Sequence, residues 1–266
     1  MSRRWGLEAK IGAVLVAAVM ALSVLSLVYT PHPVYEMVSG ARDLAPSLTH
    51  PFGTDSFGRD QLSRIMVGGR YTILVALVTV FGSALIGSAI GLTIGYFSGA
   101  LDTAVMRLVD ALSAFPGILL ALIFVAVLPA SSLTIVIALL ILFIPGFTRI
   151  MRSSMLTWRN LDFVNTALVM GAGHFRIITR HIFPNLLPVL LSALIIGLSN
   201  AILAEATLSF LGLGIQPPTP SWGRMLAEAQ SHLFSAPWCA VAPGLMIILT
   251  VLGFHFLGEG IRKRYC

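Results

Sequence analysis

Long apolar runs that lack charged residues constrain the fold of this chain more than any other feature. The run from Ile11 to Tyr29 contains no charged residue, and as a helix it is long enough to cross the hydrocarbon core of a bilayer. Comparable runs, with few or no charges, lie at Tyr71 to Phe97, Thr103 to Leu128, Leu133 to Thr148, Leu186 to Ala204 and Pro237 to Leu257. Because 57% of the 266 residues are hydrophobic and only 11% are charged, a soluble core cannot bury these runs. We therefore predict an all-α polytopic membrane protein with six transmembrane helices.

A cleaved signal peptide is the alternative for the first run. Ser2-Arg3-Arg4 is similar to the start of a twin-arginine signal. However, the run is longer than a usual signal core, and no small-x-small cleavage site follows it. We expect residues 1–30 to form an N-terminal tail and a retained first transmembrane helix.

The rest of the chain divides near residue 70. Residues 31–70 are the longest polar section, and Asp60 is placed to cap an amphipathic helix there, so we expect an extracytoplasmic loop that contains this helix. Residues 71–266 should form a core of five transmembrane helices with a polar loop at 160–185. Within that core, the Pro116-Gly117 pair predicts a kink in the third helix, since proline lacks an amide donor.

Small residues recur at every fourth position of the second apolar run, at Ser83, Gly87, Gly91 and Gly95. Such a stripe lets another helix approach closely in lipid. The packing partner is either another helix of this chain, which we favour, or a helix of a second membrane subunit.

Histidine and carboxylate residues in the polar loop raise the question of a metal site. His50, Asp55 and Asp60 lie close together in the sequence, but their spacing matches no established ligand pattern, and capping and turn roles fit them better. The six histidines of the chain are scattered over loops and helix ends. The sequence therefore predicts no metal site.

The stretch Phe163 to Pro188 is a basic interruption between two apolar runs. A short helix is predicted before Gly171 and Gly173, which allow the chain to change direction, and a second short helix carries Arg176 and Arg180 one turn apart. This pattern indicates a helix, turn, helix elbow that touches another protein. An amphipathic loop lying on the membrane surface is the alternative.

The distribution of positive charge orients the six predicted helices. If both termini are cytoplasmic, twelve of the 17 Lys and Arg residues lie on the cytoplasmic side and five lie outside, as the positive-inside rule requires. The elbow is then cytoplasmic. The net charge of +6 is explained by this topology, and no basic patch with interleaved aromatic residues indicates nucleic acid.

The elbow resembles the cytoplasmic loop of ABC importer permeases, which carries Glu-Ala-Ala, three residues, Gly, and then an Ile-x-x-x-His-Ile-x-Pro-Asn tail. The similar positions are Ala167, Gly171, Ile177, His181, Ile182, Pro184 and Asn185. Asn165 and Thr166 depart from the pattern, because the family usually has Glu and Ala there. The resemblance implies a coupling helix that docks on a separate ATPase subunit through Asn165, Thr166, Ala167, Gly171, Ala172, Ile177, His181 and Pro184.

Two other stretches narrow the resemblance to one branch. The run from His50 to Asp60, and the run from Glu205 to Gly223 with its three prolines at 217, 218 and 220, look like motifs of dipeptide, oligopeptide and nickel permeases. This implies the type I ABC importer permease fold in a bacterial or archaeal cytoplasmic (inner) membrane.

The chain itself carries no nucleotide-binding motif. No G-x-x-x-x-G-K-[ST] occurs, and its only lysines are Lys10 and Lys263. We therefore expect no catalysis and no cofactor in this chain, with ATP and Mg²⁺ held by one or two partner ATPase subunits. The resemblance further implies a second homologous permease and an extracytoplasmic substrate-binding protein as partners.

The expected substrates are dipeptides or oligopeptides, with nickel or a metal chelate as the alternative. A membrane enzyme and an ATP-independent channel are further alternatives. The candidates for an enzyme site are His174, His181, His255, Glu205 and Glu259, but neither H-E-x-x-H nor G-x-S-x-G occurs in the chain.

Overall fold

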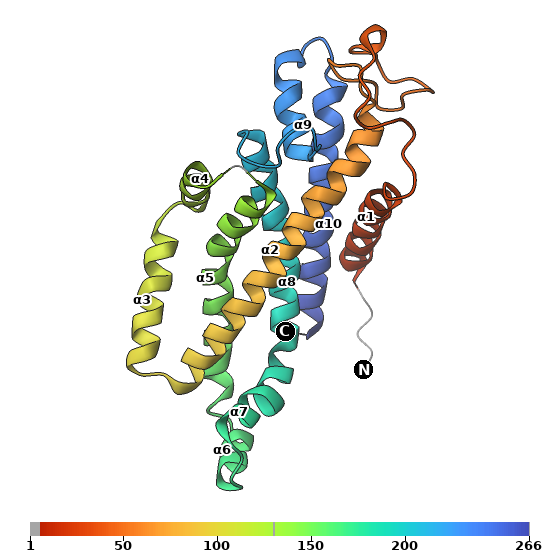
Figure 1. The fold of residues 1–266 in the computed structure, drawn as a ribbon. Helices are drawn as coiled ribbons and strands as arrows, with labels where there is room; N and C mark the ends of the chain where they lie inside the picture. The colour runs from red at the N-terminus through yellow and green to blue at the C-terminus, as the bar shows by residue number, and fades with distance from the viewer. Residues whose placement is uncertain (1–5, 130, 266) are drawn as a thin grey trace.

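The fold is an elongated bundle of helices (Figure 1), seen in a computed structural model that describes residues 6–129 and 131–265. Arg3 and Arg4, which entered the signal and orientation arguments, lie outside these residues. The helices are α1 (Leu7–Leu25), η1 (Ser39–Ala41), α2 (Gln61–Phe97), α3 (Ala100–Ala114), α4 (Gly117–Val127), α5 (Ser132–Trp158), α6 (Asp162–Val169), α7 (His174–Arg176), the π-helical turn η2 (Ile177–Ile182), α8 (Phe183–Phe210), α9 (Trp222–Ala229), η3 (Gln230–His232) and α10 (Trp238–Tyr265). In Figure 1, α6 and α7 lie at one end of the bundle, and α9 with the loop before α2 lies at the other.

The predicted membrane spans correspond to long helices. Among the described residues, five helical stretches are long and apolar enough to cross a membrane: α1, α2, α5, the continuous stretch from α7 through α8, and α10. The pair α3 and α4 passes the same test together, although the two helices are bent by 88°. The all-α membrane fold is therefore confirmed, with six spans if the bent pair counts as one.

The bend between α3 and α4 is sharper than the predicted kink. Phe115 is extended, with φ −82° and ψ 139°, and Pro116 then begins α4 without an amide to donate back into α3. The residue before a proline is disfavoured in the helical region, and here Phe115 is extended, so α3 ends instead of curving.

Several helix boundaries differ from the sequence expectation, most of all those of α2 and α5. The amphipathic helix expected at Asp60 and the second span are one helix, α2, whose first turn is capped by Asp60 accepting from the Ser63 amide at 2.8 Å. The cap is confirmed, but no break follows it. Helix α5 likewise continues through Pro145 to Trp158, ten residues beyond the predicted end at Thr148. Burial of Met151 and Met155 against α2 stabilises these extra turns.

The buried core follows the length of α2. One cluster fills the space between α2, α5, α8 and the segment around η2, and includes Ala76, Val80, Leu92, Phe147, Met151, Met155, Ile177, Ile182, Leu198 and Ile202. A second cluster joins α1, α2, α9 and α10 around Trp222, which is fully buried. Helix α2 thus contacts both ends of the molecule.

The small-residue stripe of α2 lies against α5 of the same chain. A Cβ atom added at Gly91 would lie 2.5 Å from the Thr148 carbonyl oxygen, and one added at Gly95 would lie 2.9 Å from the Met155 Cβ. Gly87 has a similarly close contact with Phe147, and Ser83 donates to the Leu140 carbonyl oxygen at 3.3 Å. The two backbones therefore approach as closely as small residues allow.

Candidate functional site

The basic interruption between α5 and α8 forms a folded projection, which we call the elbow and define as residues 162–182. Helix α6 ends in a Schellman motif: the Gly171 amide donates to the Leu168 carbonyl at 2.9 Å, and the Ala172 amide donates to the Ala167 carbonyl at 3.0 Å. Gly171 has φ +80°, a conformation that favours glycine. The elbow thereby reverses the chain at the end of the bundle (Figure 1).

The second half of the elbow runs into α8 without a break. Helix α7 is followed by the π-helical turn η2, in which the Phe183 amide donates to the Ile178 carbonyl, and then by α8. π-Helical turns occur frequently at functional sites. Helix α7, η2 and α8 therefore form one continuous helical stretch from His174 to Phe210.

The predicted coupling residues differ in exposure. Ile177 is fully buried and packs with Val164 and Ile182 in the core, so in this structure it supports the elbow from inside. The exposed members of the predicted set are Asn165, Thr166, Gly171 and Pro184, and the half-buried members are Ala167, Ala172 and His181. The exposed members lie where a partner could contact them, and their role in coupling stays a prediction.

The elbow also exposes large apolar side chains that the sequence analysis did not single out. Val169 is 89% exposed, Met170 83% and Phe175 79%, and the basic residues Arg176 and Arg180, which follow Phe175 in the sequence, are exposed as well. We call Val169, Met170 and Phe175 the apolar tip. Periodicity alone places such residues on a buried face, and only the fold shows that they point outward. An apolar tip with basic neighbours has the composition of a protein contact surface.

Helix α2 is tied to the elbow by side chains that sequence reasoning also missed. The Tyr96 hydroxyl and the His174 Nδ1 are hydrogen-bonded at 2.8 Å, near the last turn of α2. From the end of α5, Arg159 donates to the carbonyl oxygens of Gly95 at 2.9 Å and Tyr96 at 3.2 Å. A cation at the carbonyl end of a helix is favourable, so Arg159 fixes the end of α2 beside the elbow.

An apolar groove of about 480 Å³ opens between α2, α8 and the elbow. Its lining residues are Phe81, Ala84, Leu85, Ser88, Ala89, Leu92 and Thr93 of α2, Phe175, Ile178 and Thr179 of the elbow, and Phe183, Leu190 and Leu194 of α8. The groove begins at the elbow and follows the two helices that the elbow contacts. Among the described residues, the polar side chains of its lining are Ser88, Thr93 and Thr179, without a histidine, cysteine or carboxylate beside them.

The opposite end of the molecule is held by buried charges. We call residues 31–60 together with α9 the polar cap. Arg59 contacts Asp55 at 2.7 Å and Glu228 at 2.9 Å, and Arg64 contacts Glu228 at 2.8 Å. The side chains of Arg59 and Arg64 are only 8% and 1% exposed. Buried charges require such partners, so these contacts fasten the loop and α9 to the start of α2.

We expect Glu228→Ala to destabilise the polar cap strongly. Removal of the Glu228 carboxylate leaves Asp55, at 3.7 Å, as the nearest carboxylate to Arg64. Breaking a buried ion pair typically costs about 3 to 5 kcal/mol. The matched control is Glu259→Ala, which removes the exposed pair with Arg262 and should cost less than about 1 kcal/mol. Thermal unfolding of the two purified variants makes the comparison, and equal shifts would contradict the role assigned to Glu228.

Comparison with known proteins gives the fold and the family. A solved structure of the MetNI methionine ABC transporter in inward facing conformations matches with a TM-score of 0.63 and 18% identity, over 76% of this chain and 96% of that one, which supports the fold. The dipeptide transport system permease protein DppC of Alkalihalophilus pseudofirmus is 37% identical, over 95% of this chain and 83% of its own length. The glutathione transport system permease protein GsiD of Escherichia coli O157:H7 is 44% identical, over 82% of this chain and 72% of its own length.

The family assignment rests on most of the chain. The family model described as binding-protein-dependent transport system inner membrane component matches residues 71–265, which include the elbow, the groove and α9. The relatives named above match 82% and 95% of the chain, and the DppC match extends over most of the part before residue 71 as well. This chain belongs to the family of binding-protein-dependent transport system inner membrane components, the ABC importer permeases, and it is similar to the dipeptide and glutathione members of that family.

Proposed function

We propose that this chain is one permease subunit of an ATP-driven importer of small peptides. It would work with a second homologous permease, one or two ATPase subunits that hold ATP and Mg²⁺, and an extracytoplasmic substrate-binding protein. The observation that carries the proposal is the elbow, which presents the apolar tip and basic residues at one end of the bundle. Since the chain has no phosphate-binding loop of its own, an energy-supplying partner has to contact a surface of this kind.

The proposed mechanism couples the elbow to the helices that line the groove. Closure of the ATPase pair on ATP would move the elbow as a unit, because Ile177 and Ile182 anchor it in the core. Helix α8 continues from the elbow and α2 is bonded to it through Tyr96 and His174, so both helices would rock together. An inward-facing cavity between this subunit and its partner would then become outward-facing.

Peptides are the proposed substrate class because dipeptide and glutathione permeases are close relatives in sequence. Glutathione is itself a small peptide, so the two relatives agree. Nickel or a metal chelate is the alternative cargo, and no contact in the groove favours it: its lining is apolar apart from Ser88, Thr93 and Thr179.

The proposed orientation places both termini and the elbow in the cytoplasm of a bacterial or archaeal cell. Cys239 is buried and its thiol donates to the Thr54 carbonyl at 3.3 Å, so the native cysteine is a poor probe. In a chain lacking Cys239 and Cys266, Phe234→Cys, at a position that is 100% exposed, should react with an impermeant thiol reagent on intact cells. Val169→Cys, at a position that is 89% exposed, should react only after the cells are opened. The reverse pattern would overturn the orientation.

Co-purification of the tagged chain from its native membrane tests the proposed function. We expect a second permease and an ATPase subunit to come with it, and ATP hydrolysis by the complex to rise when a binding protein loaded with a dipeptide or glutathione is added. Stimulation by a nickel-loaded binding protein alone would replace the peptide assignment. A chain that purifies without any nucleotide-hydrolysing partner would refute the importer and reopen the channel and enzyme alternatives.

A further inference from the structure

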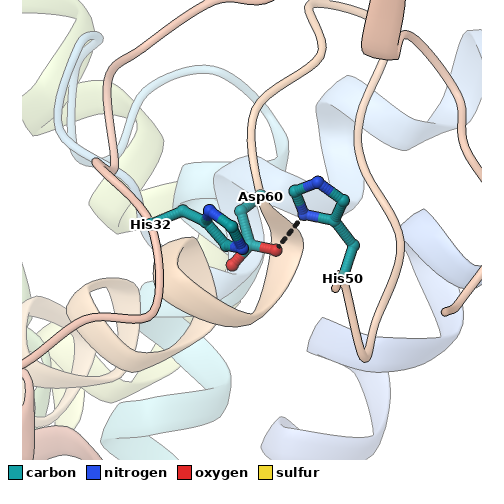
Figure 2. Close-up of side chains that lie close together, drawn as sticks. All are labelled: His32, His50 and Asp60. Atoms are coloured by element: carbon teal, nitrogen blue, oxygen red, sulfur yellow. Dashed lines mark hydrogen bonds and ion pairs between the residues drawn. The ribbon is translucent and has the colours of Figure 1, made fainter. Parts of the chain in front are cut away.

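Two histidines and one aspartate that are distant in the sequence meet at the base of the polar cap. His32 follows α1, His50 lies in the middle of the loop, and Asp60 immediately precedes α2. Figure 2 shows the three side chains converging from these separate stretches. The potential ligand atoms of the three residues all lie within 4.8 Å of one another, and His50 Nδ1 is 2.8 Å from Asp60 Oδ1.

Each of the three residues is held in place by its own hydrogen bonds. Asp60 Oδ2 accepts from the Ser63 amide at 2.8 Å and the Ser63 hydroxyl at 2.7 Å. The His50 carbonyl accepts from the Ser47 amide at 2.9 Å, and the His50 amide donates to the Ser47 hydroxyl at 3.1 Å. The His32 amide donates to the Ser63 hydroxyl at 3.0 Å. The three side chains therefore start from a fixed backbone, which is the preorganisation that a binding site needs.

A metal ion would replace the proton shared by His50 Nδ1 and Asp60 Oδ1, which would free a lone pair on each of these two atoms. Asp60 Oδ2 is occupied by Ser63, so Oδ1 is the oxygen that faces His50. His32 Nε2 lies 2.9 Å from the Thr49 carbonyl oxygen, and donation to this carbonyl leaves the lone pair on the other ring nitrogen. A histidine that binds a metal usually donates its second ring N–H to a carbonyl or a carboxylate in this way.

We propose that His32, His50 and Asp60 bind a divalent transition ion of the Zn²⁺ class. Two imidazoles and one carboxylate are ligands that such ions prefer, and a set of three protein ligands leaves a fourth position for water. In tetrahedral geometry with bonds of about 2.0 to 2.1 Å, the ligand atoms lie about 3.3 Å apart. His50 Nδ1 and Asp60 Oδ1, which are 2.8 Å apart, have to move apart only slightly to reach this separation. The two imidazoles are partly exposed, so they can rotate to bring the other ligand atoms to the same separation.

The arrangement of the rings supports a metal more than a simple ion pair. The His32 and His50 rings lie with centroids 4.5 Å apart and planes tilted by 31°, so two imidazoles crowd around one carboxylate. An ion pair with Asp60 needs only one of them. A bound ion uses both, and it would fasten the segment after α1 and the middle of the loop to the first turn of α2.

The sequence could not indicate this set. Spacing alone brought His50 together with Asp55 and Asp60, but Asp55 is engaged with Arg59 at 2.7 Å. His32 lies beside His50 and Asp60 only because the loop folds back over the start of α2. The proposed ion is a resident one that ties chain segments together, so the proposal does not depend on which substrate the importer carries.

Metal binding to the purified full-length chain tests the proposal. After dialysis against a chelator, Zn²⁺ is titrated in competition with a chromophoric chelator, and metal content is measured after gel filtration. We expect one equivalent of Zn²⁺ per chain and a rise in the unfolding temperature when it binds. His32→Ala and His50→Gln should each weaken binding at least roughly tenfold, since even the loss of an outer partner of a metal ligand has an effect of that size.

Two further variants separate metal binding from structural damage. Asp60→Asn keeps an oxygen that can cap α2 but removes the charge, so the metal-free protein should stay folded while zinc affinity falls. His232→Ala is the matched control, because His232 also lies near a carboxylate, 3.9 Å from Asp43, but belongs to no such cluster among the described residues. Absence of stoichiometric binding, or affinity that is unchanged in both His32→Ala and His50→Gln, would overturn the proposal.

Discussion

Phe175→Asp is expected to detach the ATPase subunit from a correctly folded permease. Phe175 is 79% exposed in the apolar tip, so the substitution leaves no cavity in the core. It also lies in the first turn of the helical stretch that leads into α8, where a carboxylate is favoured by the helix dipole. The cost should therefore fall on the interface. Loss of a central aromatic contact typically costs about 2 kcal/mol or more, which weakens binding roughly thirtyfold.

Co-purification of the ATPase with the tagged variant measures this effect, alongside peptide uptake by cells. Phe175→Leu should retain most of the partner, since it keeps an apolar surface. Phe234→Asp is the matched control, because Phe234 is 100% exposed and belongs to the segment between η3 and α10. That segment follows α9, which lies at the end of the bundle opposite α6 and α7 (Figure 1). If Phe175→Asp retains the ATPase as well as Phe234→Asp does, the elbow is not the docking site and the amphipathic surface loop considered from the sequence becomes the better interpretation.

The membrane spans could be predicted from the sequence because they depend on a local property. A helix in hydrocarbon satisfies its backbone within one segment, so a long apolar run is sufficient to indicate it. The sharp turn at Gly171 and the cap at Asp60 are equally local, since each is decided by a few neighbouring residues. These features agree with the structure for that reason.

The full lengths of α2 and α5 could not be predicted because distant side chains stabilise their outer turns. The first turns of α2 are polar by composition, yet Arg64 is buried because Glu228 of α9 pairs with it. The last turns of α5 extend past the predicted end because Arg152 forms two hydrogen bonds with Asp102 of α3 and because Met155 is fully buried. Glu228 is distant in the sequence from Arg64, and Asp102 is distant from Arg152, so no local pattern predicts these two pairs.

The same reasoning explains what was missed at the elbow. The motif located its turn, but exposure of Val169 and burial of Ile177 depend on where α6 and η2 rest against α5 and α2. The bond between Tyr96 and His174 joins residues 78 positions apart. It gives α2 a direct connection to the elbow, so that one helix, 37 residues long, extends from the proposed ATPase contact to the polar cap.

Gly91→Ala is expected to damage the fold more than any other single methyl group added to α2. The new Cβ would lie 2.5 Å from the Thr148 carbonyl oxygen and 2.9 Å from the Arg152 amide nitrogen. Both atoms belong to the backbone of α5, so no side chain can rotate away and the two helices have to separate. Overpacking usually costs about 1 to 3 kcal/mol, and we expect the upper end of this range for Gly91→Ala and loss of the protein from the membrane for Gly91→Leu.

The controls for this prediction come from glycines in the same pair of helices. Gly146→Ala in α5 places its Cβ where no atom lies within 4 Å, so it should be neutral or slightly stabilising through its helix propensity. Gly82→Ala in α2 meets only the flexible end of Leu140, at 2.7 Å, and should have an intermediate effect. The level of each variant in the membrane and its unfolding temperature in detergent give the order. If Gly91→Ala behaves like Gly146→Ala, the added methyl group meets no rigid atom of α5. The close contact between α2 and α5 then does not hold the bundle together.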